Sequence, residues 1–236
     1  MASTTYVYAG GAGGLFRREA NGRSWERLTN GMPEENIRAI TVDPAHPEIV
    51  FIGTDHGPYR SQDQGKSWTR LDFPNTDIQI WSILIDPHDP QRLYAGGSPV
   101  SFFRSTDSGD SWQALPNPQI ENRVKMPFAC RVMRLAANPH KPNELYATLE
   151  VNGVVRSQDG GMTWRDCTDD LVRLAVAADG DAERRGRPLP HAVGIDDDPV
   201  GAGLGVGEEH VLDRGIGQAV HVAVGVHVQR AAAGIA

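Results

Sequence analysis

Short apolar segments separated by turn residues recur along the first two thirds of the chain. One set, at residues 37–42, 80–85 and 132–136, runs into Pro-rich turns that read DPAHP, DPHDP and NPHKP. A second set follows those turns at residues 49–53, 93–96 and 145–148, and a third set ends at Arg60, Arg104 and Arg156. Segments of this length, rich in β-branched and aromatic residues and bounded by turn residues, are typical of strands.

An eight-residue motif, S-x-D-x-G-x-[ST]-W, follows the third segment of each unit. It stands at residues 61–68, 105–112 and 157–164, and a degenerate copy at residues 19–25 precedes them. The tryptophans of the four copies lie 43, 44 and 52 residues apart. A fourth strand is predicted to begin at each tryptophan, and four strands in about 45 residues make one blade of a β-propeller. The sequence therefore predicts an all-β propeller with about three and a half four-stranded blades and an incomplete ring.

The residue types in this motif predict a folding device. Asp and Ser side chains hydrogen-bond to nearby backbone and fix a tight turn, glycine supplies a positive φ, and tryptophan buries a large apolar area. The structural residues predicted in this way are Ser61, Asp63, Gly65, Trp68, Ser105, Asp107, Gly109, Trp112, Ser157, Asp159, Gly161 and Trp164. The copies lack the distal bidentate glutamate of an EF-hand calcium loop, so we expect no metal and no cofactor.

These repeats resemble the BNR/Asp-box propellers, which include sialidases, xyloglucanase-type glycoside hydrolases, sortilin-like receptors and photosystem assembly factors. The resemblance covers roughly residues 5–170 and implies the fold alone, because the box occurs in all these proteins and carries the chemistry of none. The segment Leu15-Phe16-Arg17-Arg18 is a poor match to the Phe-Arg-Ile-Pro-like segment of sialidases.

One stretch resembles xyloglucanases in more detail. Residues 53–60, Gly-Thr-Asp-His-Gly-Pro-Tyr-Arg, are similar to the Thr-Asp-x-Gly-Gly-x-Tyr-Arg stretch in which those enzymes carry one of two catalytic carboxylates. The resemblance implies that Asp55 is a catalytic general base, although Pro58 stands where the family has its second glycine. Inverting hydrolysis needs a second carboxyl group roughly 6.5–9.5 Å away, and residues 1–170 offer no compelling partner. Non-catalytic Asp-box proteins also carry Gly-Thr-x-x-Gly at this turn, so a structural role for Asp55 stays open.

The sequence leaves two functions open. The first is a glycan-related propeller resembling xyloglucanase-type glycoside hydrolases, which we expect to be inactive as this chain. The second is a non-catalytic propeller that serves as a protein-binding or assembly scaffold. The expected ligand is accordingly a polysaccharide or another protein.

Blade topology indicates where a ligand would bind. The turns between second and third strands lie on the face opposite the boxes, together with the links into the next blade, and the resemblance places ligands on that face. The candidates that it offers beside Asp55 are His56, Gln79, Trp81, Arg123, Lys125, Arg131 and Glu150. Aligning the first strands puts Arg38, Trp81 and Met133 at one equivalent position near the mouth of the channel. We expect Asp55, Trp81, Arg123 and Arg131 to border a polar pocket, with Trp81 either stacking on a sugar or packing between blades.

The chain changes character after Trp164. Residues 171–236 contain no Phe, Trp, Tyr, Lys, Ser, Thr, Asn, Cys or Met, and no box or Pro-rich turn recurs. We therefore divide the chain into a partial propeller at residues 1–170 and a low-complexity tail at residues 171–236, in which only residues 221–228 alternate weakly like a strand. The tail is a disordered segment, a small separate domain, or the product of a reading frame that slips near residues 174–176. We favour the frame slip, because it explains both the narrow alphabet and the loss of the repeats.

The net charge limits the classes of partner that we expect, and the cysteine content predicts the state of the thiols. The formal net charge of −7 argues against binding to nucleic acid or to a membrane surface, because both are anionic. The two cysteines, Cys130 and Cys167, are expected to be free thiols. No basic segment followed by an apolar one stands at the start, so we predict no secretory signal and expect a cytoplasmic protein. Because open blade edges expose apolar faces, we also expect self-association.

Overall fold

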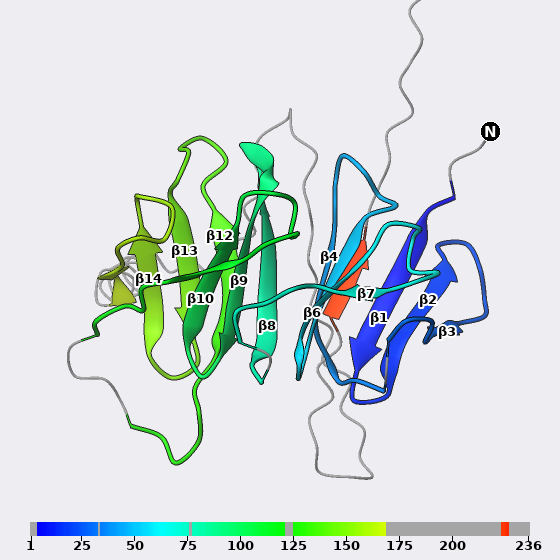
Figure 1. Ribbon diagram of the computed structural model, residues 1–236, viewed down its shortest axis with the longest axis horizontal. Helices are drawn as coiled ribbons and strands as arrows, with labels where there is room; N and C mark the ends of the chain where they lie inside the picture. Colours follow the sequence, from blue (N-terminus) through cyan, green and yellow to red (C-terminus); the bar gives the residue numbers. More distant parts are fainter. Residues whose placement is uncertain (1–3, 33, 76, 121–124, 169–222, 227–236) are drawn as a thin grey trace, which may run out of the picture.

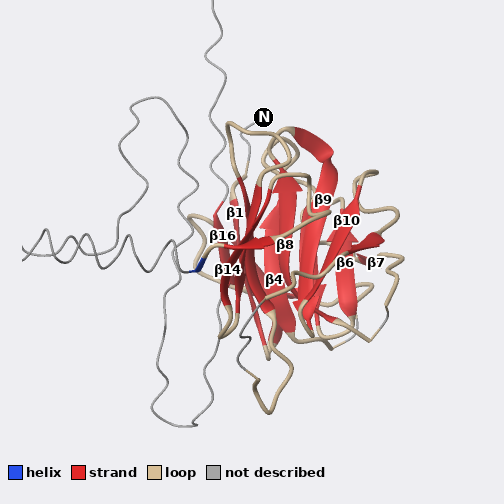
Figure 2. Cartoon of the chain, turned by 90° about the vertical axis from the view of Figure 1, so that its left-hand side faces the viewer, coloured by secondary structure: helices blue, strands red, loops and turns tan. Residues whose placement is uncertain are grey.

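The computed structural model describes residues 4–32, 34–75, 77–120, 125–168 and 223–226, which form four antiparallel sheets of four strands each (Figure 1). We name the sheets blades A to D in chain order. Strands and the loops between them make up almost all of the described chain (Figure 2). No helix among these residues is long and apolar enough to cross a membrane.

The strands of a blade follow one another from the inner to the outer edge, except that the inner strand of blade A comes from the C-terminal part of the chain. Blade A consists of β16 (Ala223–Val226), β1 (Tyr6–Gly11), β2 (Gly14–Glu19) and β3 (Glu26–Leu28). Blade B consists of β4 (Ile37–Val42), β5 (Val50–Thr54), β6 (Gly57–Ser61) and β7 (Thr69–Arg70). Blade C consists of β8 (Gln79–Asp86), β9 (Asp89–Ser98), β10 (Ser101–Ser105) and β11 (Gln113–Leu115). Blade D consists of β12 (Val132–Ala137), β13 (Leu145–Leu149), β14 (Gly153–Ser157) and β15 (Arg165–Asp166).

The blades are arranged as in a propeller that lacks part of its ring. The inner strands β16, β4, β8 and β12 lie side by side in this order, and blades A and D stand at opposite ends of the molecule (Figure 1). The predicted all-β, incomplete propeller is thereby confirmed.

One segment of the C-terminal tail forms a strand, and it lies within residues 221–228, the part of the predicted irregular tail that alternates weakly like a strand. Ala223–Val226 pairs antiparallel with β1 and completes blade A, so that four sheets stand where about three and a half blades were predicted. An unpaired β1 would present a row of free N–H and C=O groups, and β16 satisfies them. The frame slip, the disorder and the separate domain considered for the tail concern residues that lie, apart from this strand, outside the described part of the chain.

Three apolar clusters fill the spaces between successive blades. The cluster between blades A and B includes Tyr8, Leu15, Leu28, Ile52 and Trp68. The cluster between blades B and C includes Phe51, Phe73, Ile80, Leu93 and Trp112. The cluster between blades C and D includes Tyr94, Phe102, Leu115, Val132 and Leu145. Each blade therefore buries its apolar face only against its neighbours, as in other repeat architectures.

The three boxes fold into the same hydrogen-bonded turn. Ser61 Oγ donates to Asp63 Oδ1 (2.8 Å) and accepts from the Gly65 N–H (2.7 Å). Ser67 donates to Asp63 through its N–H (2.9 Å) and its hydroxyl (2.6 Å). The other two boxes repeat these bonds at Ser105, Asp107, Gly109 and Ser111, and at Ser157, Asp159, Gly161 and Thr163. Hydrogen bonds from Ser111 and Ser105 lower the pKa of Asp107 to about 2, so these carboxyl groups remain ionised acceptors in the turn.

Candidate functional site

The inner strands of blades B, C and D bend at the same position. Their pairing with the second strand shifts by one residue between Ile37 and Ala39, between Ile80 and Ser82, and between Val132 and Arg134. The residues at these β-bulges are Arg38, Trp81 and Met133, the three that the alignment of first strands brings together. A bulge re-aims the side chain that it carries. We call the face with these bulges and with the turns between second and third strands the link face, and the opposite face the box face.

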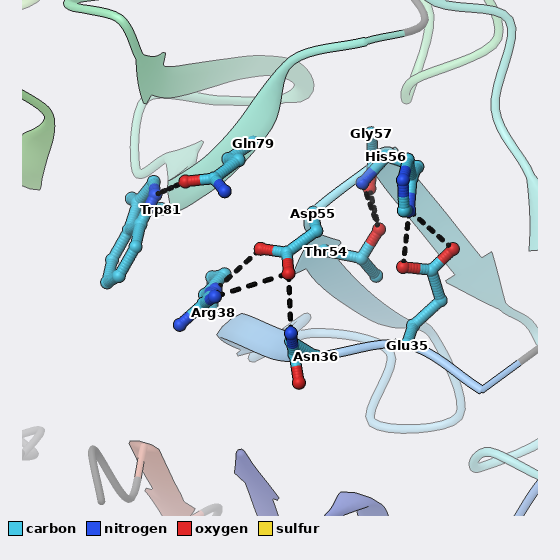
Figure 3. Close-up of polar contacts among 9 residues, drawn as sticks. All are labelled: Glu35, Asn36, Arg38, Thr54, Asp55, His56, Gly57, Gln79 and Trp81. Atoms are coloured by element: carbon cyan, nitrogen blue, oxygen red, sulfur yellow. Dashed lines mark hydrogen bonds and ion pairs between the residues drawn. The ribbon is translucent and has the colours of Figure 1, made fainter. Parts of the chain in front are cut away.

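Asp55 is held by two side chains of its own blade. Arg38 Nε and Nη2 donate to Asp55 Oδ1 (2.7 Å) and Oδ2 (3.2 Å), and Asn36 Nδ2 donates to Oδ2 (2.6 Å) (Figure 3). Partial burial raises the pKa of the Asp55 carboxyl, but the hydrogen bonds from Arg38 and Asn36 and the charge of Arg38 outweigh burial, so the pKa is lowered. Both oxygens of Asp55 are thus occupied, and the carboxylate is a weak proton acceptor.

The turn that carries Asp55 is fixed by short-range contacts. The Thr54 hydroxyl donates to the carbonyl of Gly57 (2.8 Å) and accepts from the His56 N–H (3.1 Å). The His56 ring lies against Glu35, with 2.9 Å between Nδ1 and Oε2 (Figure 3). The hydrogen bond to Glu35 and its negative charge raise the pKa of His56. Glu35 and His56 therefore form a second hydrogen-bonded pair next to Asp55.

Trp81 lies between two guanidinium groups. The central carbon of Arg38 is 4.6 Å from the centre of the Trp81 ring, and that of Arg131 is 4.0 Å from it. The indole N–H donates to Gln79 Oε1 (3.0 Å). Because Arg38 belongs to blade B and Arg131 immediately precedes blade D, the cations reach the ring from the two flanking blades. Only 9% of Trp81 is exposed, so a sugar would have to displace a guanidinium group to stack on it.

Arg131 forms an ion pair at blade D that has the same geometry as the Arg38 pair of blade B. Its Nε and Nη2 donate to the two carboxylate oxygens of Glu150 at 2.7 Å each, and the Glu150 N–H donates to the carbonyl of Arg131 (2.9 Å). Asp55, Arg38, Trp81, Arg131 and Glu150 thus form a continuous row across blades B to D, which we call the link-face row. Each cation in the row has its own carboxylate.

The structure brings most of the predicted site residues to this row. His56, Gln79, Trp81, Arg131 and Glu150 lie with Asp55 on the link face, whereas Lys125 is exposed in the link before blade D. Arg123 lies outside the described residues, so its place in a pocket stays a prediction. Among the residues that the structure describes, no three His, Cys, Asp or Glu side chains are grouped so that they could hold a metal ion.

Sequence reasoning missed the partners that fix Asp55. Asn36 and Arg38 were not selected as site residues, and Glu35 carried no recognisable signal. Asn36, Gln79 and Arg131 each lie one residue before an equivalent buried residue of the inner strands, and these buried residues are Ile37, Ile80 and Val132. Extending the alignment of the first strands by one residue would have found this polar position.

One protein family matches more than half of the chain. The family is Sortilin-Vps10, described as sortilin, neurotensin receptor 3, and its match covers residues 56–187. The chain belongs to the Sortilin-Vps10 family. The part matched to Sortilin-Vps10 contains the three complete boxes and most of the link-face row, and its residues 169–187 lie outside the described part of the structure. No curated protein matches this Sortilin-Vps10 chain.

Solved structures similar to this Sortilin-Vps10 chain include two enzymes of the glycoside hydrolase group GH74. An ancestral GH74 enzyme is 20% identical with a TM-score of 0.55, and the match covers 69% of this chain and 25% of that one. A GH74 enzyme of Niastella koreensis is 19% identical with a TM-score of 0.54, covering 69% of this chain and 27% of that one. YCF48 bound to D1 peptide is 18% identical with a TM-score of 0.46, covering 61% and 43%. The GH74 matches show a common fold, and the chain spans about a quarter of the length of those enzymes.

Proposed function

We propose that this chain is a non-catalytic propeller whose protein or peptide ligand contacts the link face of blades B to D. The observation that carries the proposal is the state of Asp55, the one candidate catalytic carboxylate. Arg38 and Asn36 occupy its oxygens, and its pKa is lowered. A general base works best with a pKa near the working pH and an oxygen directed at the reacting water. Glu150, the other carboxylate of the row, is tied to Arg131 in the same way.

The side chains around the row favour a protein ligand over a glycan. Phe128, Met133 and Val151 are exposed large apolar residues in the segments that flank the Arg131–Glu150 pair. Aromatic, methionine and arginine side chains are enriched at protein interfaces, and exposed apolar groups rimmed by charge mark such surfaces. Trp81, the candidate sugar platform, is instead covered. The family is described by a receptor, sortilin, which supports a binding role.

A hydrolysis assay on xyloglucan tests the non-catalytic part of the proposal. The wild-type chain, Asp55→Asn and Glu150→Gln are compared at equal concentration, and the two variants remove matched carboxylates from the same row. We expect no release of reducing ends above the blank from any of the three. Hydrolysis by the wild type that is lost in Asp55→Asn and kept in Glu150→Gln would overturn the proposal and favour the glycan-hydrolase alternative.

Selection of peptides tests the binding part. Peptides from a random displayed library are selected on the wild-type chain and then measured against two variants by fluorescence anisotropy. A Met133→Ser, Val151→Ser double variant alters the link face, and Met162→Ser alters an equally exposed residue on the box face. We expect the first to weaken binding by about tenfold or more, as loss of apolar interface contacts does, and the second to leave it unchanged. Equal affinities for all three proteins would count against the link face.

A further inference from the structure

One arginine contact joins each blade to the next. In all four blades an arginine on the third strand pairs across the sheet with an aromatic residue on the second. The pairs are Tyr8 with Arg17, Phe51 with Arg60, Tyr94 with Arg104, and Tyr146 with Arg156. Arg17 and Tyr8 both donate to the carbonyl of Gln64 in the box of blade B, and Arg60 donates to the carbonyl of Ser108 in the box of blade C (3.0 Å). We call this arrangement the arginine half of the interface.

The third interface is built around the equivalent box position. Gln64, Ser108 and Gly160 have left-handed φ values of 62°, 59° and 70°. A Cβ placed on Gly160 would lie 3.6 Å from Arg104 Nη1 and 3.3 Å from Tyr94 Oη. Arg104 therefore reaches the box of blade D as Arg17 and Arg60 reach those of blades B and C.

The box tryptophan forms the other half of the interface. Trp68 and Trp112 are 4% and 8% exposed, and the ring of Trp112 packs 5.2 Å from Phe73 of the preceding blade. The box glycine beside the tryptophan meets a leucine of that blade. A Cβ on Gly65 would lie 2.9 Å from Leu28 Cδ1, and one on Gly161 would lie 2.7 Å from Leu115 Cδ1. We call this the tryptophan half.

Blade D, the last in the order of blades, carries an arginine half on its open side. The Arg156 side chain is 31% exposed, against 6% for Arg17 and 17% for Arg60. Its Nη2 donates to Glu144 of the same blade (2.9 Å), and its buried Nε finds no partner among the described residues. Tyr146 is partly exposed, whereas its counterparts in the other blades are buried.

Blade A carries a tryptophan half on its open side. Trp25 is 46% exposed, and Arg18 lies 5.2 Å from the centre of its ring. The degenerate box around it lacks the first Ser and the Asp of the others but keeps Ser24 and the glycine, Gly22, three residues before the tryptophan. Trp25 is exposed because no described blade precedes blade A and offers it a surface.

We propose that a second copy of this chain joins the two halves, with blade A of one copy docking on blade D of the other. Trp25 packs on Tyr146, Arg156 and Cys167, because Cys167 holds the position of Leu28, Leu71 and Leu115, three residues after the box tryptophan of its blade. Blade A of one copy thus follows blade D of the other, as each blade follows the preceding one within a chain. A head-to-tail contact of this kind closes into a ring of copies or runs on into a longer assembly.

One residue of blade D departs from the pattern and limits how close the docked blade comes. Thr148 stands where the second strands of the other blades carry Gly10, Gly53 and Gly96. A Cβ on Gly10 or Gly96 would lie 2.5 Å from the inner strand of the next blade, and one on Gly53 closer still. The incoming blade therefore contacts blade D through its outer strands and box, and its inner strand stays further away.

An engineered disulfide tests the register of the contact. Within the chain, the box glycine of one blade lies against the leucine position of the preceding blade. In the proposed contact, a cysteine introduced by Gly22→Cys in one copy therefore faces Cys167 of the other copy. Under mild oxidation we expect Gly22→Cys to give a reducible species of at least twice the monomer mass. The same substitution in a Cys167→Ala background and an exposed control, Gly13→Cys, should not. Absence of that species in Gly22→Cys, or equal cross-linking in the two controls, would overturn the proposal.

Sedimentation of two further variants separates this contact from general aggregation. Trp25→Ala removes an exposed ring and should weaken self-association by about tenfold or more without loss of far-ultraviolet circular dichroism. Thr148→Gly should strengthen association, because it lets the inner strand approach. A wild-type chain that is monomeric over a wide concentration range would overturn the proposal, as would association unchanged in Trp25→Ala.

Discussion

At the scale of single residues, the two ion pairs of the link-face row have the same design. Arg38 and Arg131 each present two nitrogens to a carboxylate, and each also lies against Trp81. A planar guanidinium can make both contacts at once, whereas a lysine ammonium cannot pair in this fork geometry. The two arginines therefore link blades B and D to Trp81 of blade C at the link face, while each stays paired with a carboxylate of its own blade.

Asp55→Asn tests the energetic side of this design. The variant keeps the shape of the side chain but removes the charge that Arg38 pairs with, so we expect the free energy of unfolding at pH 7 to fall by about 1–3 kcal/mol. Because the pKa of Asp55 is lowered in the fold, this contribution is present above the unfolded pKa of about 4 and is lost as the pH falls through the lower folded value. Urea unfolding between pH 2 and pH 7 measures it.

Asp72→Asn is the matched control, since Asp72 is an exposed carboxylate in the link after blade B. We expect its unfolding free energy to stay within about 0.5 kcal/mol of the wild type at every pH. If Asp55→Asn behaved like this control, the ion pair would not contribute to stability. That result would favour a catalytic role for Asp55.

At the scale of elements, a buried serine holds the turn of each complete box, directly before the fourth strand of its blade. Ser105 Oγ donates to Asp107 (2.7 Å) and accepts from the Gly109 N–H (2.8 Å), and it is 1% exposed. Ser105→Ala leaves that buried N–H without its acceptor, so we expect a loss of about 1–3 kcal/mol in unfolding free energy. Thr106→Ala, the exposed neighbour in the same turn, should cost little. A small effect of Ser105→Ala would mean that water replaces the hydroxyl.

The boxes also show how far local sequence determines structure. Apolar segments, turn residues and the repeat predict the inner strands, for example Ile37–Val42 and Val132–Ala137, and the turns that follow them. The same motif residues do not always make the same hydrogen bond. Trp68 and Trp112 donate to the carbonyls of Gly65 and Gly109, but the buried Trp164 Nε1 has no partner among the described residues. The motif therefore specifies the turn but not the hydrogen bond of its tryptophan.

The site was harder to predict than the strands because it is made by bulges. The alignment found Arg38, Trp81 and Met133 at one position, but it did not show that Arg38 turns to Asp55 in its own blade and also lies against Trp81 in the next. That choice depends on the distance between neighbouring inner strands, which no local pattern of apolar and polar residues records. Glu35 was missed because its partner His56 lies 21 residues away along the chain.

At the scale of the whole molecule, the first blade is built from both ends of the described chain. Val7, Tyr8, Ala9 and Gly10 of β1 pair with Val226, Gly225, Val224 and Ala223 of β16. Pairing between strands more than 200 residues apart carries a loop-closure entropy cost, and no local pattern shows which strand is the partner. The weak alternation at residues 221–228 indicated a strand-like segment, but sequence reasoning did not show that it completes the sheet of blade A.

Val224→Pro tests whether this pairing stabilises blade A. Proline removes the N–H of Val224 and fixes φ near −65°, so it cannot take part in a ladder as an interior strand residue. We expect the amide hydrogens of β1 to exchange faster by about tenfold or more, while those of β9 in blade C keep their protection, because strands far from the lost ladder open independently. Val224→Thr, which keeps the backbone N–H and β-branching, is the control and should leave β1 protected. Exchange of β1 that is equally slow in both variants would show that blade A holds together without β16, and its open inner edge would then be a second place at which another chain could pair.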